Sequence, residues 1–439
     1  MHYPKNAEEL KNIIIEARNS GTSLVPVSSG APHIHGASIN PGAETVSFEK
    51  MNRVMKIDRT SRYVRVESGV TFGELIPLVK EHGMRLNTPF LPRANKSVVA
   101  SALEREAVLV PKYQFDYTDS LLNVEVIYGT GDDFRTGSAA GPGPMEELKS
   151  DMVTPWGPGT IDYMRFVTGA QGTMGFVTWA TLKTEIMPSA SKLFFVEADS
   201  AECLTKLAAS LLCDRIPDDC IILNAANLAC AFGNDEAERR SIQADAAPWT
   251  LICCVSGLER YPERRISLYE GYLKDSCEKY GLKAEDAPSE NKQLAERIEN
   301  MLWDCDRRET YWKLHRGGVR EILFLCPPSA APKYVEILKT QFSGFPEDCV
   351  GITVQPQVQG RAFRIECDVF CSEDKLAEIE DKCAEVERLL LEEGAYFDRP
   401  YGDIAKLVYS ADPVGTDALR KVKAIFDPDN ILNPGKLCF

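Results

Sequence analysis

The chain has 439 residues, of which 44% are hydrophobic and 26% charged, an ordinary globular composition that suffices for two or three domains. Its formal net charge of −15 argues against nucleic acid as a main partner, and no apolar run is long enough to span a membrane. The 14 cysteines are scattered without CxxC spacing, which excludes clustered zinc or iron–sulfur ligands and, with no secretory signal visible, predicts a cytoplasmic protein.

The N-terminal part predicts strands that alternate with two helices. The stretches NAEE at 6–9 and TFGE at 71–74 are capping-box patterns, and Gly21 and Gly83 stand where these helices should end. Runs rich in β-branched residues predict strands over residues 24–27, 45–48, 54–58, 63–68, 123–128 and 133–136. The Gly- and Pro-rich stretch 139–158 is expected to be a loop.

From about Leu193 the pattern changes to a second α+β unit. Strands are expected at 194–198 and as a pair within 351–370. Helices are expected over residues 201–212, 264–280, 288–301, 374–394 and 413–426. The sequence contains no internal repeat and no low-complexity linker, so the fold class is α+β.

Three glycines spaced three residues apart precede a predicted strand in GAQGTMGFVTWATL, residues 169–182. One interpretation is a tight turn before the strand. The other is a close approach of the backbone to a ring or a pyrophosphate, which side chains would prevent.

The loop SSGAPHIHG at 28–36 has the composition of an anion cradle. Its short side chains let backbone N–H groups point inward, and its serine hydroxyls add donors. The loop has no GxxxxGK(S/T) pattern, so it is not the phosphate loop of a nucleotide hydrolase. The alternative is an ordinary surface loop.

The predicted strand pair in GITVQPQVQGRAFRIECDVF, residues 351–370, alternates between apolar and polar side chains. One face collects Thr353, Gln355, Gln357, Arg364, Glu366 and Asp368. This face is either solvated or the wall of a ligand pocket. His315, in YWKLHRGGVR, is either a structural histidine or a catalytic group. Hydrolase chemistry lacks an anchor because no G-x-S-x-G elbow is present.

Four segments together resemble the flavoproteins of the vanillyl-alcohol oxidase / p-cresol methylhydroxylase superfamily, which includes D-lactate and glycolate dehydrogenase-like members. VPVSSGAPHIHGAS is similar to the family's pyrophosphate loop, and FEKMNRVMKIDRTSRYVRVESGVTFGEL to the run that follows it. GAQGTMGFVTWATL resembles the segment "GseGtlGivTeatl", and FDPDNILNPGKLCF the C-terminal "lDPdnilNPGK". The resemblance extends over nearly the whole chain, in order.

The resemblance implies an FAD-binding domain of the p-cresol methylhydroxylase type, with two subdomains, and an α+β cap domain over the flavin. We expect the FAD-binding domain over 1–190, the cap or substrate domain over 191–399, and a segment over 400–439 that returns to the first domain. The positions that the resemblance assigns to FAD are Ser28, Ser29, Gly30, Ala31, His33, Gly36, Gly169, Gly172, Thr173, Gly175, Val177, Asn433 and Lys436.

The sequence departs from the family pattern in places. Val99 and Ala100 stand where a Gly-Gly pair is usual, which implies a reshaped pocket near the flavin. Some members tether FAD through a histidine, and His33 and His35 lie in the corresponding loop. The HxHxGxGN-type metal motif of the lactate dehydrogenase branch is absent, so no metal is expected. The segment FDRPYGDIAKLVY is closer to the phenol-oxidising branch, where a Tyr/Arg pair binds phenolate.

We therefore expect an FAD-dependent oxidoreductase that oxidises a small hydroxy acid, alcohol or phenol by hydride transfer to flavin N5 while a base removes a proton. The candidate catalytic residues are Gln355, Gln357, Arg364, Glu366, Arg399, Tyr401 and His315, with the glutamate as a candidate base. Electrons would pass to a separate acceptor: an electron-transfer flavoprotein, a quinone or an iron–sulfur subunit.

Two alternatives remain open at the level of the sequence. The chain could be a non-catalytic flavin-binding or electron-transfer subunit of a larger redox complex, or a structural homologue that binds no flavin. Neither the substrate, the acceptor, covalent attachment of FAD nor the formation of an oligomer can be predicted from these residues.

Overall fold

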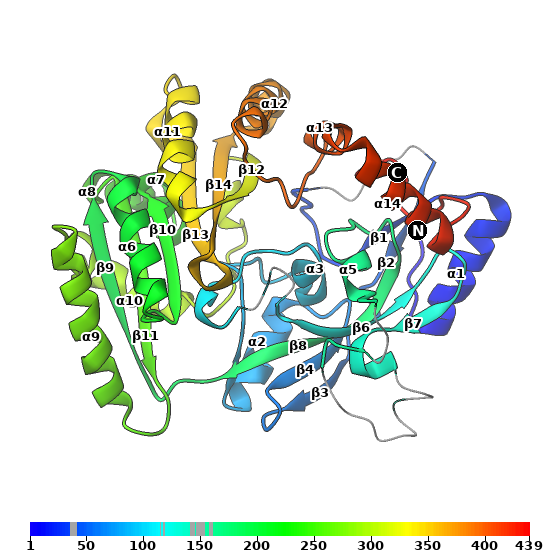
Figure 1. Ribbon diagram of the computed structural model, residues 1–439, viewed down its shortest axis with the longest axis horizontal. Helices are drawn as coiled ribbons and strands as arrows, with labels where there is room; N and C mark the ends of the chain where they lie inside the picture. Colours follow the sequence, from blue (N-terminus) through cyan, green and yellow to red (C-terminus); the bar gives the residue numbers. More distant parts are fainter. Residues whose placement is uncertain (36–41, 115, 117–118, 141–144, 146–153, 158–160) are drawn as a thin grey trace.

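Three β-sheets flanked by helices make up the part of the chain that the structure describes (Figure 1). This computed structural model describes residues 1–35, 42–114, 116, 119–140, 145, 154–157 and 161–439. Gly36 and most of the loop expected at 139–158 lie outside these residues.

The N-terminal part forms two of the sheets. The smaller one pairs β1 (Leu24–Val27) in parallel with β2 (Glu44–Ser47). The larger one has the order β3-β4-β8-β6-β7, and β5 also pairs with β8. Its strands are β3 (Val54–Asp58), β4 (Tyr63–Glu67), β5 (Met84–Leu86), β6 (Leu121–Ile127), β7 (Asp133–Arg135) and β8 (Phe176–Ile186).

The third sheet is antiparallel, with the order β12-β14-β13-β10-β11-β9. Its strands are β9 (Ala190–Ala198), β10 (Asp219–Asn224), β11 (Trp249–Gly257), β12 (Gly318–Cys326), β13 (Val350–Gln357) and β14 (Ala362–Cys371). The described α-helices are α1 (Ala7–Ser20), α2 (Phe72–Glu81), α3 (Val98–Leu103), α5 (Met164–Val167), α6 (Ala201–Cys213), α7 (Ala225–Phe232), α8 (Glu236–Asp245), α9 (Pro262–Lys279), α10 (Lys292–Met301), α11 (Ala331–Gln341), α12 (Leu376–Glu392), α13 (Asp403–Ala411) and α14 (Pro413–Phe426).

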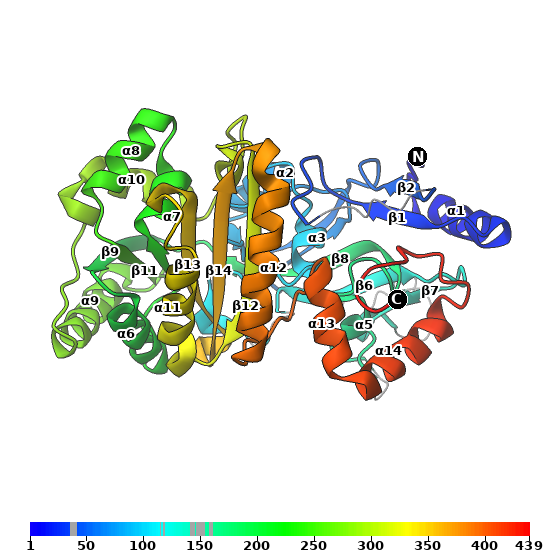
Figure 2. The ribbon, with the colours of Figure 1, turned by 90° about the horizontal axis from the view of Figure 1, so that it is seen from above.

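The two faces of the third sheet differ in polarity. One face is apolar throughout and packs against α6, α9, α11 and α12, burying Phe194, Phe324 and Phe363 (Figure 2). The opposite face is largely apolar over β9 to β11 and polar over β13 and β14, with Glu321 of β12 beside them. Thr353 pairs with Glu366 across β13 and β14, so the predicted polar face of the strand pair is confirmed.

The C-terminal segment lies against the N-terminal elements (Figure 1). Leu432 forms a parallel bridge with Leu24 of β1, and both lie in one apolar cluster with residues of α1. The Lys423 ammonium donates to the carbonyl oxygen of Thr173 at 2.7 Å, directly beside the glycine-rich turn. This arrangement is the one expected of a segment that returns to the first domain, and the domain boundaries themselves stay a prediction.

Local signals placed the two N-terminal helices correctly. Thr71 and Glu74 form both bonds of a capping box at the start of α2. Asn6 caps α1 by accepting from the backbone of Glu9 at 2.9 Å, and Gly21 ends this helix at φ 69°. The helix expected from residue 288 begins instead at Lys292, after a single 3-10 turn.

Candidate active site

A cavity opens between the N-terminal sheets and the polar face of the third sheet. Its empty space, including the part open to solvent, is about 1780 Å³. Side chains from both the N-terminal part and the third sheet line this space.

One wall of the cavity comes from the N-terminal part and the C-terminal segment. It includes Ser28, Ser29, His33, Val99, Ala100, Gly172, Gly175, Val177, Asn433 and Lys436. All of these except Val99 and Ala100 were predicted to contact FAD, and those two are the departures from the family pattern.

Four other predicted positions do not line the cavity. Asn95 accepts from the backbone N–H of Gly30 through its carbonyl and donates from its side chain to the carbonyl of Ala31. Thr173 is fully buried, and Gly169 packs beside an arginine. A contact of these four positions with FAD stays a prediction.

The wall has the chemistry that an anionic dinucleotide requires. Lys436 is half-buried, burial lowers its pKa, and no carboxylate among the described residues pairs with it. Asn433 donates to the carbonyl of Gln171 at 2.6 Å, while its own Oδ1 is buried without a hydrogen-bond partner among the described residues. An unpaired cation and an unsatisfied polar atom at one wall fit FAD.

The glycines of the ladder are explained by the protein itself. Gly169 and Gly172 have φ of 71° and 72°, a region that side chains rarely adopt. A Cβ on Gly172 would lie 2.4 Å from the Pro26 side chain, and one on Gly175 would lie 2.5 Å from that of Val126. Of the two interpretations, the tight turn accounts for these residues, although Gly172 and Gly175 also line the cavity.

We expect Gly172→Ala to lower the free energy of unfolding by about 1–3 kcal/mol even without FAD, because of strained backbone and the contact with Pro26. Urea unfolding of the FAD-free protein measures this. Gly271→Ala is the control, because nothing lies within 4 Å of its added Cβ in helix α9. Unchanged stability combined with lost FAD would instead show that this position faces only the cofactor.

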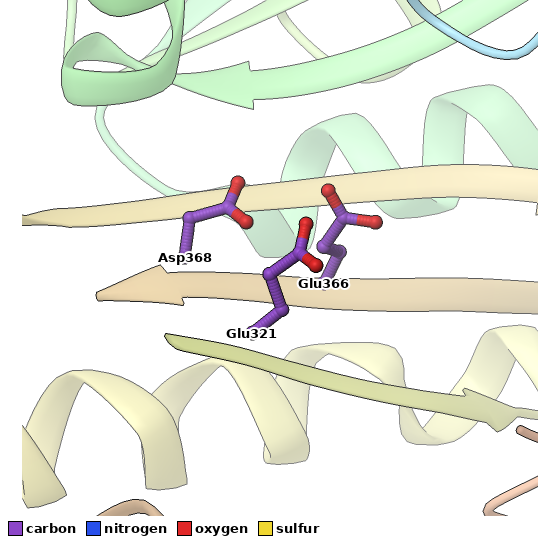
Figure 3. Close-up of side chains that lie close together, drawn as sticks. All are labelled: Glu321, Glu366 and Asp368. Atoms are coloured by element: carbon purple, nitrogen blue, oxygen red, sulfur yellow. The ribbon is translucent and has the colours of Figure 1, made fainter. Parts of the chain in front are cut away.

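The other wall, from the third sheet, carries a buried charged cluster. The Lys313 ammonium donates to the carboxylates of Glu321, Glu366 and Asp368, the last at 2.9 Å. Figure 3 shows the three carboxylates together on one side of β12 and β14, and their oxygen atoms lie within 4.8 Å of one another. The ammonium supplies the positive charge that such a group requires, so we assign no metal here.

The pKa values of two carboxyl groups in the cluster are shifted in opposite directions. Burial, with repulsion from Glu366 and Glu321, outweighs the attraction of Lys313 and raises the pKa of Asp368 to about 8. Glu321 is also buried, yet Lys313 and His35 hold its pKa well below the usual range. Asp368 therefore carries a proton near neutral pH, and Glu321 is ionised.

His35, from the N-terminal part, contacts Glu321 of the third sheet. Its Nε2 lies 2.6 Å from Oε2 of Glu321, and its side chain is 14% exposed. Its ring stacks on that of Tyr401, with centroids 4.1 Å apart and planes at 11°. The sequence suggested His35 only as a tether for FAD.

Arg399 and Tyr401 lie side by side at the cavity wall. Nη2 of Arg399 donates to the Tyr401 hydroxyl at 3.3 Å, and the Arg399 Nε is buried without a partner among the described residues. Burial raises the pKa of Tyr401 to about 12 although Arg399 opposes the shift, so this hydroxyl keeps its proton. The pair thus offers a cation and a neutral donor to an anionic oxygen.

Two carboxylates near Arg399 form ion pairs with Lys96. Lys96 binds Glu104 at 2.9 Å and Glu106 at 2.5 Å, whereas Arg399 Nη2 lies 3.7 Å and 3.9 Å from them. Burial would raise the pKa of Glu106, but Lys96 and Arg399 lower it to about 2. Arg399 therefore keeps most of its hydrogen-bonding capacity.

The remaining predicted residues have structural partners. Gln355 lines the cavity but donates to a backbone carbonyl at 2.7 Å. Gln357 is buried against Gln114 and does not reach the cavity. Arg364, 2% exposed, pairs with Asp398 at 2.8 Å instead of facing a ligand.

His315 lies in a separate cavity and does not join the candidate site. Its Nε2 is 3.6 Å from the Cys230 thiol, and its ring packs edge-on against Phe370. Burial lowers its pKa to about 4. A half-buried histidine with both ring nitrogens near protein partners fits the structural alternative that the sequence left open.

Five residues that line the cavity were not predicted from the sequence: Lys96, Glu104, Glu106, Lys313 and Glu321. Among them Lys313 lies in YWKLHR, a stretch considered only for its histidine. The others reach the cavity through contacts between distant segments.

Comparison with known proteins identifies the two ends of the chain. Residues 1–137 match the FAD binding domain, and residues 401–437 match the C-terminal domain of FAD linked oxidases. The chain is thus an enzyme of the FAD-linked oxidase/dehydrogenase type. This FAD-linked oxidase chain therefore binds FAD, which agrees with the chemistry of the cavity wall.

Relatives and solved structures extend the similarity over the whole chain. Glycolate oxidase subunit GlcD of Bacillus subtilis is 23% identical over 99% of this chain and 87% of its own length. The 4-cresol dehydrogenase (hydroxylating) flavoprotein subunit of Pseudomonas putida is 26% identical over 49% of this chain and 41% of its own. The structure of substrate-bound p-cresol methylhydroxylase, 18% identical, matches with a TM-score of 0.83 over 100% of this chain and 88% of that one.

The predicted fold and cofactor are thus confirmed: an α+β flavoprotein with the p-cresol methylhydroxylase fold. Among the helices that the structure describes, none combines the length and apolarity needed to cross a membrane.

Proposed function

We propose that this FAD-linked oxidase oxidises a small phenol, whose anionic oxygen binds between Arg399 and Tyr401. The observation that carries the proposal is the Arg399 guanidinium, which is 6% exposed, lines the cavity and has an unpaired buried Nε. A buried cation without a full set of acceptors favours an anionic ligand oxygen.

The two side chains would bind a phenolate in complementary ways. Arg399 remains charged because Tyr401 and the carboxylates near it raise its pKa despite burial. Tyr401 already accepts a hydrogen bond from Arg399, so its own O–H is free to donate to the ligand. Two donors directed at one oxygen stabilise its negative charge in a water-poor site.

Aromatic side chains that line the same cavity favour a substrate with an aromatic ring. Phe90, Tyr311 and Trp312 line the cavity, and Phe90 meets Trp312 edge-on with ring centroids 6.0 Å apart. Aromatic pairs of this kind bind another ring through its faces and edges.

When bound, FAD supplies the hydride acceptor for the oxidised carbon. The residues that would hold it are Ser28, Ser29, His33, Gly172, Gly175, Val177, Asn433 and Lys436. The chain's own contribution is to bind the substrate oxygen, orient the ring and exclude water.

Electrons must afterwards leave for an acceptor, which we propose is a separate protein or a quinone. Two of the relatives are named as subunits, glycolate oxidase subunit GlcD and the 4-cresol dehydrogenase flavoprotein subunit. The partner is of the kinds that the sequence suggested: an electron-transfer flavoprotein, a quinone or an iron–sulfur subunit.

A 2-hydroxy acid is the second candidate substrate. GlcD is similar over 99% of this chain, and its name refers to glycolate. A carboxylate would use the same cation, since arginine binds carboxylates with two parallel hydrogen bonds. The aromatic wall favours the phenol.

Anaerobic titration of the FAD-loaded protein tests the proposal. We expect 4-alkylphenols to bleach the visible flavin band and 2-hydroxy acids to leave it unchanged. Bleaching by hydroxy acids alone would replace the phenol with the second candidate. A bound flavin that no member of either class bleaches would favour the non-catalytic subunit, and a protein that takes up no FAD would contradict the whole assignment.

A further inference from the structure

The environment of His35 fixes which of its ring nitrogens can react. Nε2 lies 2.6 Å from the Glu321 carboxylate, which is buried and ionised. An ionised carboxylate only accepts hydrogen bonds, so Nε2 carries the hydrogen. In the neutral ring, Nδ1 then presents the lone pair that can accept a proton.

The carboxylate behind His35 is itself held in place. Lys313 donates to Glu321 from the other side, and both side chains are only 7% exposed. Tyr401 covers the ring by stacking on it. An imidazole oriented by a fixed carboxylate is the arrangement that general bases use to accept a proton.

Other carboxylates near the cavity are less suited to accept a proton. Glu366, the base suggested by the sequence, is paired with Lys313. Glu104 and Glu106 share Lys96, and the pKa of Glu106 is about 2. The lysine ammonium groups thus already occupy oxygen atoms of these carboxylates.

We propose that Nδ1 of His35 accepts the O–H proton of the substrate, with Glu321 as the residue that positions the ring. The proposal rests on the phenol site at Arg399 and Tyr401, which lies next to His35 because Tyr401 contacts both. The groups facing His35 are Glu321 with Lys313 behind it, and Tyr401 with Arg399 beside it.

Bound FAD would supply the two-electron acceptor. A 4-alkylphenol would lose its hydroxyl proton to His35 and a hydride from its benzylic carbon to that acceptor, and would leave as a quinone methide. The imidazolium that forms is stabilised by the Glu321 carboxylate.

Binding of plain phenol, which has no benzylic hydrogen and cannot be oxidised in this way, isolates the proton transfer. An ultraviolet difference spectrum of the FAD-loaded protein with phenol distinguishes bound phenolate from bound phenol. We expect wild type to show the phenolate band at neutral pH. His35→Gln should show the band only at a higher pH than wild type, shifted toward about 10, the ordinary value for a phenol hydroxyl. Reduction of its flavin by a 4-alkylphenol should slow by about 10²-fold at neutral pH.

Two further variants make the test specific. Glu321→Gln keeps the ring but removes the charge behind it, so the onset of the phenolate band should move to a higher pH than in wild type. His82→Gln, on an exposed histidine at the end of α2, should match wild type. The visible flavin absorbance of each variant shows that FAD is retained.

The outcomes separate this proposal from the one on which it rests. Phenol that binds as phenolate equally in wild type and His35→Gln would overturn the role of His35 and leave the phenol site intact. Phenol that fails to bind wild type would overturn both. A wild-type spectrum in Glu321→Gln would overturn the positioning role of the carboxylate.

Discussion

Replacing Arg399 by glutamine should lower kcat/KM for a 4-alkylphenol by about 10²–10³-fold, the range found when one donor to a developing oxyanion is removed. The glutamine keeps a neutral donor but loses the charge and the planar fork. Stopped-flow reduction of the bound flavin measures the effect without an electron acceptor. The kcat/KM of Arg399→Lys should lie between those of wild type and Arg399→Gln, because lysine restores the charge but not the planar guanidinium.

A matched control uses Arg388→Gln, because Arg388 is exposed on α12 away from the cavity. This variant should retain wild-type kinetics. FAD content should be unchanged in all three variants, since neither Arg399 nor Arg388 is among the residues proposed to hold FAD. Normal phenol turnover by Arg399→Gln would contradict the proposed substrate site.

Much of the fold could be predicted because its signals are local. A capping box such as Thr71 with Glu74 uses residues three positions apart, and alternation on β13 and β14 follows from the pleat of each strand. The strands β10 and β11 lack such a signal. They are buried on nearly every residue, so their sequences show an apolar run rather than alternation.

The candidate site could be predicted only in part, because it is built from distant segments. The pairing of His35 with Glu321 joins residues far apart in the chain, and neither residue has a neighbour that marks it. Arg399 and Tyr401 came from the resemblance to a family rather than from any pattern. Gly172 is a further case: its glycine spacing is visible in the sequence, but the reason for it, a positive φ and the nearby Pro26 side chain, involves a distant segment.

Replacing Lys313 by methionine should lower the free energy of unfolding by about 3–5 kcal/mol at pH 8, the usual cost of leaving buried charges unpaired. Three carboxylates would then share a site without a counterion. The folded pKa of Asp368, about 8 in the wild type, lies above its unfolded value. The stabilisation from this raised pKa is therefore complete below about pH 4 and is lost as the pH rises through 8. Without Lys313 the carboxylates repel each other more strongly, so the loss of stability should be smaller at pH 5 than at pH 8.

Urea unfolding at both pH values measures this difference. Lys333→Met is the control: Lys333 pairs with Glu393 on the surface, where an ion pair contributes about 0–1 kcal/mol. If Lys313→Met unfolds too readily to be measured, the double variant Lys313→Met with Asp368→Asn removes one of the three carboxylates and should regain stability at pH 8. A loss for Lys313→Met no larger than that of the surface pair would mean that water reaches the cluster and screens it. Lys313 would then not hold the Glu321 carboxylate firmly behind His35. The stability of this cluster therefore also tests the proposed proton transfer.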